Sequence, residues 1–155
     1  MLNVKMLPLN IQSKWEKEVH TGVVIEDWSF IYCIPFSVTK DTKLQDFQYK
    51  LIHRILIPNS FLYKCGLKET ELCTFCTETK KNLVHIFWEC NYVWYFWLAI
   101  GNFLKICGVS LPFNAKDIIL GLTEHSSAQG TINNVLIILK YYIQCICLQI
   151  QMQGP

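Results

Sequence analysis

The spacing of apolar residues along the chain predicts helices joined by short polar turns. The clearest case is residues 42–56, TKLQDFQYKLIHRIL, in which apolar residues recur at helical intervals: Leu44, Phe47, Leu51, Ile52, Ile55 and Leu56. Thr42 and Gln45 have the spacing of a capping box, and Pro58 is expected to end the helix. The opposite, polar face of this helix would carry Gln48, Lys50, His53 and Arg54.

Two shorter helices are expected on either side of this segment. Residues 26–34 begin with acidic residues and are followed at once by Pro35, as is typical of a short helix that ends there. Residues 59–66 predict a two-turn helix with Asn59 or Ser60 as its cap and Gly66 just past its end.

Three more helices are expected in the second half of the chain. The segment 92–107 has apolar residues on nearly every face, which predicts a helix buried on most sides. Asn114 has the position of a cap for a helix at 114–120, and the last helix is expected from about 133 to 149. The fold class is therefore mainly α: a small helical domain, with at most one short β-hairpin near the cysteines.

The most apolar run, residues 135–150, contains Lys140 and Gln144. A membrane span needs about 20 largely apolar residues, and this run has sixteen. We therefore expect a buried core helix here and no contact with a membrane.

Composition bounds the class of protein. At 155 residues without repeats or linkers, the chain is expected to be a single unit, residues 1–155, with a core at 42–107, for which the cysteines and histidine discussed below predict metal binding, flanked by helical segments at 1–41 and 108–155. Hydrophobic residues make up 52% and charged residues 17%, which indicates that part of the apolar surface needs a partner. The net charge of +2 is too small for a strongly basic nucleic-acid-binding protein.

Cysteine usage points to a reducing compartment. The chain has eight cysteines, but its start lacks the apolar region and cleavage site of a secretory signal. We therefore expect reduced thiols and an intracellular location, in the cytoplasm, the nucleus or both.

Four potential metal ligands lie within residues 73–90, CTFCTETKKNLVHIFWEC. They have the spacing C-x2-C-x8-H-x4-C and are Cys73, Cys76, His85 and Cys90. Two cysteines separated by two residues can bind one ion in a tight turn, and three thiolates with one imidazole complete a closed tetrahedron around a structural zinc ion, Zn²⁺. A histidine among scattered cysteines favours zinc over an iron–sulfur cluster. The alternative is that these four side chains are ordinary core residues.

The last two ligands impose a condition on the backbone. Positions five apart on an α-helix point about 140° away from each other, so His85 and Cys90 cannot share a face of a regular helix. With Asn82 as its cap, this helix is therefore expected to end or tighten near Glu89. Cys33, Cys65 and Cys107 are expected to pack in the core, with Cys65 as a less favoured alternative ligand, and Cys145 and Cys147 are not expected to form a joint ligand pair. A catalytic cysteine–histidine pair is disfavoured because no oxyanion loop accompanies it.

The segment from LQDFQYKLIHRIL through LYKCGLKETELCTFC to HIFWEC resembles the zinc-binding region that follows the polymerase domain of non-LTR (LINE-type) retrotransposon reverse transcriptases. Weaker likeness extends over most of the chain. Asn91 departs from the family pattern, because many relatives have proline there. The resemblance implies that Cys73, Cys76, His85 and Cys90 are zinc ligands. It also implies that the chain is the C-terminal portion of such a polyprotein, as a remnant or a partial gene product. The polymerase domain, with its paired aspartates, would be absent, so the chain is expected to be non-catalytic.

Three functions follow from this resemblance. The first is binding of RNA or DNA through a basic, acid-free segment, with the expected contacts Lys50, His53, Arg54, Lys64 and Lys68 and with Tyr49 or Tyr63 stacking on a base. The second is a structural module that docks on the polymerase domain through Trp88, Trp94, Trp97 and the final helix. The third is a retroelement fragment without a present function.

Overall fold

The structure is a computed structural model that describes residues 9–19, 27–56, 59–79, 82–111 and 113–152. It is mainly helical, as the sequence predicts, with 68% helix and 1% strand. The described helices are α1 (Leu9–Glu18), α2 (Trp28–Val38), α3 (Thr42–Ile52), α4 (Asn59–Lys64), the π-helical turn η1 (His85–Glu89), α5 (Asn91–Ile106), α6 (Ala115–Leu120) and α7 (Gln129–Met152). Residues 1–41 were expected to be helical, but the bounds of α1 were not predicted.

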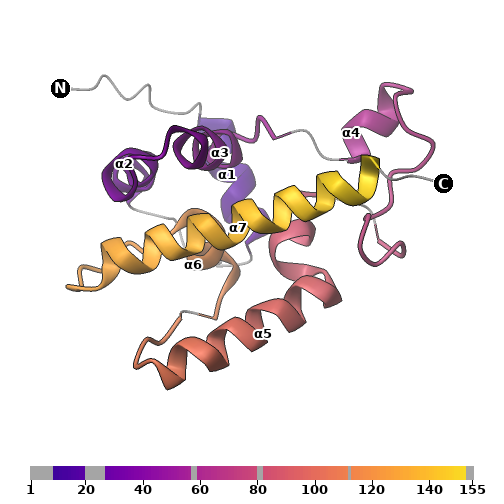
Figure 1. Ribbon diagram of the computed structural model, residues 1–155. Coiled ribbons are helices and arrows are strands. Elements are labelled where there is room, and N and C mark those ends of the chain that lie inside the picture. Colours follow the sequence, from indigo (N-terminus) through magenta and orange to yellow (C-terminus); the bar gives the residue numbers. More distant parts are fainter. Residues whose placement is uncertain (1–8, 20–26, 57–58, 80–81, 112, 153–155) are drawn as a thin grey trace.

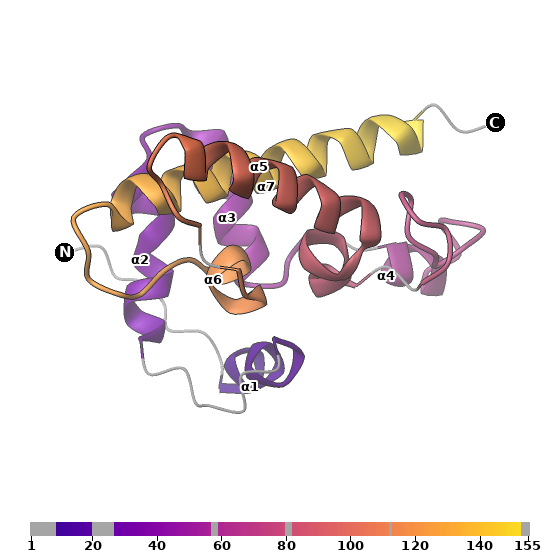
Figure 2. The ribbon, with the colours of Figure 1, turned by 90° about the horizontal axis from the view of Figure 1, so that it is seen from below.

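Helix α7 runs through the middle of the protein. In Figure 1, α2 and α3 lie on one side of it, and α5 lies on the other side and runs in the opposite direction. The helices α2, α3 and α6 all pack against α7. Figure 2 shows α1 at the edge of the assembly, farther from α7 than α6 is. The core lies between these helices and includes Ile31, Leu51, Ile119 and Leu136, each fully buried.

A buried lysine lies at the centre of this packing. Lys140 in α7 is 0% exposed, and its Nζ donates to Gln48 Oε1 at 2.7 Å and to the Ile119 carbonyl at 2.6 Å. Gln48 Nε2 donates to the same carbonyl at 3.1 Å. The Lys140 amine thus links α7 to α3 and α6. Gln48 is fully buried, so the prediction that it belongs to the polar outer face of α3 is wrong.

Helix α2 is longer than the sequence suggests. It continues through Pro35, which lies inside the helix and is buried, and ends at Val38. Proline removes one backbone hydrogen bond and normally interrupts a helix. Here Ile34 and Pro35 are buried and Phe36 and Ser37 are exposed, and α2 as a whole packs against α3 and α7.

Helix α3 begins and ends differently from the prediction. Its cap is Asp41, whose carboxylate accepts from the backbone N–H groups of Lys43 and Leu44, and not Thr42. The helix ends at Ile52, before Pro58, because Arg54 adopts a positive φ of 57°. Ile55 consequently lies outside the core and is 52% exposed.

The short helix α4 forms where the sequence predicts it. Gly66 follows α4 with a positive φ of 71°, and the Leu67 N–H donates back to the Leu62 carbonyl at 2.9 Å. This is the glycine-terminated helix end that the sequence indicates. The side chains of Asn59 and Ser60, the candidate caps, lie outside the described residues.

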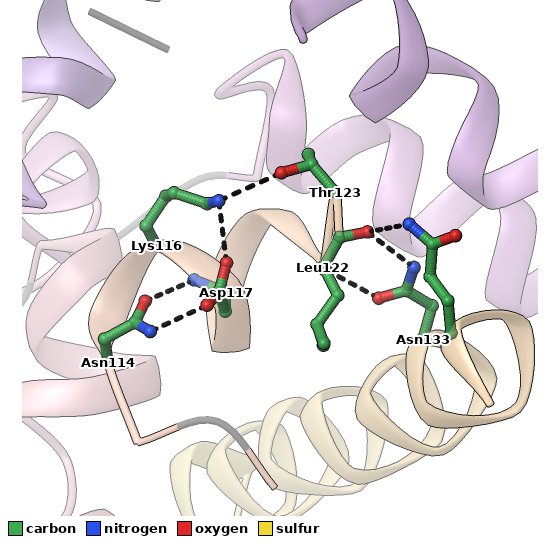
Figure 3. Close-up of polar contacts among 7 residues, drawn as sticks. Asn114, Lys116, Asp117, Leu122, Thr123 and Asn133 are labelled. Carbon is green, nitrogen blue, oxygen red and sulfur yellow. Dashed lines mark hydrogen bonds and ion pairs between the residues drawn. The ribbon is translucent and has the colours of Figure 1, made fainter. Parts of the chain in front are cut away.

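Helix α6 is capped by Asn114, which accepts from the Asp117 N–H at 2.8 Å, as predicted (Figure 3). Lys116 pairs with Asp117 at 2.7 Å. Beyond α6, the side-chain amide of Asn133 accepts from the Leu122 N–H and donates to the Leu122 carbonyl, which fixes the loop onto the start of α7.

Helix α5 lies on the surface, so the prediction that it is buried on most sides is wrong. Only Val93, Trp97 and Gly101 are buried in it. Its outward face is unusually apolar, with Tyr95 70% and Ile106 86% exposed. A nearly continuous apolar pattern therefore reflects, in this helix, one face in the core and one face toward solvent.

Helix α7 starts four residues before the predicted 133 and extends to Met152. Among the described helices it is the one long and apolar enough to cross a membrane, judged by length and composition alone. Its buried face packs in the core, and the absence of membrane contact stays a prediction.

Candidate metal centre

The structure brings the four predicted ligands together. The ligand atoms of Cys73, Cys76, His85 and Cys90 all lie within 4.8 Å of one another, so the group could hold a metal ion. The sulfurs of Cys73 and Cys90 are 3.9 Å apart, and Cys76 Sγ is 3.4 Å from His85 Nε2. Cys73, His85 and Cys90 are buried, and Cys76 lies at the edge.

The first two cysteines are positioned by a tight turn. The Cys73 N–H donates to the Thr79 carbonyl at 2.8 Å, and the Thr77 N–H donates to the Cys73 carbonyl at 2.9 Å. Thr77 has a positive φ of 56°, which reverses the chain. Next to the turn, Leu72 forms a single β-bridge, the described trace of the expected hairpin.

The other two ligands are positioned by η1. Asn82 Oδ1 accepts from the His85 N–H at 2.7 Å, so Asn82 is the predicted cap. The Cys90 N–H then donates to the His85 carbonyl, five residues earlier, at 2.9 Å. This wider turn brings residues five apart onto the same side of the helix. The prediction was that the helix ends or tightens near Glu89. It does end there, and its last turn is wider than an α-helical turn instead of tighter.

Backbone N–H groups point at all three sulfurs. Cys73 accepts from Phe75 and Cys76, Cys76 accepts from Glu78 and Thr79, and Cys90 accepts from Tyr92 and Val93. In each case the donors lie two and three residues after the cysteine. Such donors stabilise a negatively charged sulfur, the form that binds metal.

Burial shifts the thiol pKa in the opposite direction to these hydrogen bonds, because it disfavours the charged thiolate. It raises the pKa of the Cys73 thiol and raises the pKa of Cys90 to about 12. At Cys76 burial also raises the pKa, but hydrogen bonds from the backbone of Glu78 and Thr79 and from the side chains of Cys73 and Cys90 together outweigh it and leave the pKa below its usual value. Three thiolates this close repel one another, and a bound cation removes that repulsion.

The donor set fits one tetrahedral ion. With bond lengths of about 2.3 Å to sulfur and about 2.0 Å to nitrogen, tetrahedral geometry separates two sulfurs by about 3.8 Å and a sulfur and a nitrogen by about 3.5 Å. The two measured separations, 3.9 Å and 3.4 Å, agree with these values.

One support of the site has no signal in the sequence. Gln151, near the end of α7, donates to Thr74 Oγ1 in the cysteine turn at 3.0 Å. The two residues are 77 positions apart. Only the folded chain reveals that α7 supports the turn.

The basic residues predicted to contact nucleic acid lie apart from this cluster and are partly paired within the protein. Arg54 donates two hydrogen bonds of 2.9 Å to Glu18 and lies over the Trp15 ring. Lys50 pairs with Asp46 at 2.7 Å, and His53 stacks on Tyr49. Lys64 is exposed, and Lys68 is half-buried.

Five cysteines lie outside the cluster, and no described cysteine forms a disulfide. Cys33, Cys65 and Cys107 are exposed, so the prediction that they pack in the core is wrong for these three. Cys33 lies on the exposed side of α2, and Cys65 and Cys107 come directly after the ends of α4 and α5.

Comparison with known proteins adds no assignment. No protein-family model matches the chain, and a search of curated proteins finds no match. The role of the cluster is therefore inferred from its own donor atoms and geometry.

Proposed function

We propose that Cys73, Cys76, His85 and Cys90 bind one zinc ion with a structural role. The observation that carries this proposal is the convergence of four donor atoms within 4.8 Å of one another, with two backbone N–H groups aimed at each sulfur. A bound zinc ion would link the cysteine turn to η1 and the start of α5. Four protein ligands leave no open position for water or substrate, so the proposed metal site is structural and not catalytic.

The resemblance extends this proposal to a larger protein. The resembling segment includes α3, the cysteine turn and η1, and all four positions of the family's ligand motif are filled. We infer that the chain is a zinc-stabilised module of a non-LTR reverse transcriptase, which acts through its surfaces.

Docking on the polymerase domain is the surface function that the geometry supports best. The outer side of α5 exposes Tyr95, Phe103 and Ile106, all large apolar residues that monomeric surfaces seldom gather on one helix. Trp94 also faces outward and is 36% exposed, whereas Trp97 is fully buried and serves the core. An apolar face of this kind is typical of a surface that is covered in a larger assembly.

Nucleic-acid binding is the second candidate, favoured by one observation. Tyr49 is 37% exposed and stacks on His53 next to Lys50, an arrangement of aromatic rings beside a cation that suits an unpaired base. Arg54 is committed to Glu18 and Trp15, so we expect it to serve stability and not RNA contact.

The paired variants Arg54→Ala and Lys64→Ala separate these roles. Loss of the paired, partly buried guanidinium should lower the free energy of unfolding by about 1–2 kcal/mol and leave RNA affinity unchanged. Loss of the exposed Lys64 amine should leave stability unchanged and, if the basic segment binds RNA, reduce the salt dependence of binding by about one counterion. Denaturation and anisotropy with a single-stranded RNA at two salt concentrations measure both. Salt-independent binding, or none, would remove nucleic acid as a partner.

The zinc proposal is tested by metal content and melting temperature of the wild type, Cys76→Ser and Cys107→Ser. Because metal binding energy contributes to folding, Cys76→Ser should lose its zinc and melt at a lower temperature. Cys107 is exposed and outside the cluster, so Cys107→Ser should keep both properties. Equal metal content in the two variants would refute the ligand assignment.

A further inference from the structure

A groove opens beside the four candidate metal ligands. It has a volume of about 320 Å³ and is lined by Cys76, Glu78, Asn91, Tyr92 and Tyr95. The cysteine turn forms one wall and the first turn of α5 the other. Its lining includes Cys76, one of the proposed zinc ligands, and Tyr95, which also belongs to the exposed face of α5.

Two tyrosines give the groove aromatic walls. Tyr92 is 64% and Tyr95 70% exposed, and residues three apart lie on the same side of a helix. Exposure of two large rings at one place is costly in water unless a ligand covers them. The face of a tyrosine ring carries partial negative charge and attracts cations.

The described charges of the groove are negative. Glu78 is exposed, and its carboxylate has no ion-pair partner among the residues that the structure describes. With zinc bound, three thiolates and one neutral imidazole leave a net charge of about −1 at the adjoining centre. The N-terminus of α5 does not reverse this, because the N–H groups of Tyr92 and Val93 point at the Cys90 sulfur. Phosphate-bearing ligands are thereby disfavoured.

We propose that this groove binds a methylated lysine side chain of a protein partner. The aromatic walls would surround the alkylated ammonium group, and Glu78 would supply the opposite charge. An unmodified ammonium is compact and strongly hydrated, so it gains less from aromatic walls than a methylated one, whose charge is spread over its methyl groups. The volume is sufficient for such a group and its aliphatic stem. This goes beyond the structural role of zinc and rests on the zinc centre for part of the charge.

The test uses the full zinc-loaded chain and the amide of N-acetyl-trimethyllysine as probe. Titration followed by NMR should shift the backbone amide signals of Asn91, Tyr92 and Tyr95, and the same amide of unmodified lysine should bind more weakly. Tyr95→Ala should weaken binding about fivefold or more, whereas Tyr95→Phe, which keeps the ring, should bind like the wild type. Glu78→Gln should also weaken binding.

Two matched variants serve as controls. Tyr63→Ala removes an exposed tyrosine, and Glu89→Gln an exposed carboxylate, both outside the groove lining, and neither should change the affinity. Zinc content is measured for every variant, so that a failure of the metal centre is recognised separately. The proposal is overturned if zinc-loaded protein does not bind the probe, if Tyr95→Ala binds equally well, or if a short oligonucleotide shifts the groove signals instead.

Discussion

The Lys140 amine is buried in the centre of the protein. Among the described residues, no carboxylate pairs with it. Its only recorded partners are the Gln48 side chain and the Ile119 carbonyl. Burial lowers the pKa of Lys140 well below its usual value of 10.5. A neutral amine can still donate both hydrogen bonds, so burial favours the uncharged form of this lysine in the folded state.

The pH dependence of stability follows from this shift. Because the folded-state pKa lies below the unfolded-state pKa, the unfolded chain binds more protons between the two values, and the free energy of unfolding rises with pH there. The slope should approach about 1.4 kcal/mol per pH unit below pH 10.5. Chemical denaturation of wild type and Lys140→Met from neutral to alkaline pH measures it. Both proteins carry the same cysteines, so a slope that is equal in the two would contradict the assignment to Lys140.

Single residues also show what a helical pattern leaves undetermined. The pattern of α3 correctly placed Phe47, Leu51 and Ile52 inside. It placed Gln48 outside, because its partner Lys140 is 92 positions away and a pattern within one helix carries no information about it. Arg54 was likewise read as free for phosphate, since Glu18 lies in a helix that the sequence did not indicate.

At the scale of elements, η1 makes the metal cluster possible. In a regular helix His85 and Cys90 would point about 140° apart. The i→i+5 hydrogen bond between them removes that conflict, and Cys90 then leaves the helix in an extended conformation. Sequence spacing exposed the conflict, but the choice between a tighter and a wider turn depends on packing around Phe87 and Trp97.

The cap of this turn can be tested against a cap elsewhere. Asn82→Ala and Asn114→Ala each remove one side-chain acceptor at a helix start, and each should cost about 1 kcal/mol of stability. Only Asn82 holds the backbone of a ligand, so only Asn82→Ala should also weaken zinc affinity. Competition with a chelator measures that affinity. A similar loss of affinity in Asn114→Ala would show that zinc binding follows global stability and not the position of His85.

The exposure of α5 could not have been read from the chain. Its apolar residues are equally consistent with burial on all sides and with one buried and one docking face. The boundaries of a helix, in contrast, depend on local residues. Gly66 correctly predicts the end of α4, and Asn114 correctly predicts the start of α6.

At the scale of the whole molecule, the group of four candidate ligands lies between two parts of unequal packing. The helices around α7 share a continuous core, whereas between residues 65 and 79 Cys73 is the only buried residue. The cluster and the contact of Gln151 with Thr74 are two of its links to the rest of the protein, and Phe75 packs against the core as a third. We therefore expect a bound metal ion to order this segment further.

The central claim is that three sulfurs and one nitrogen hold a single zinc ion. X-ray absorption at the zinc edge of the purified protein measures this coordination directly. The account predicts three sulfur neighbours at about 2.3 Å and one nitrogen neighbour at about 2.0 Å. It is contradicted by protein that folds without zinc, or by a bound zinc ion with fewer than three sulfur neighbours.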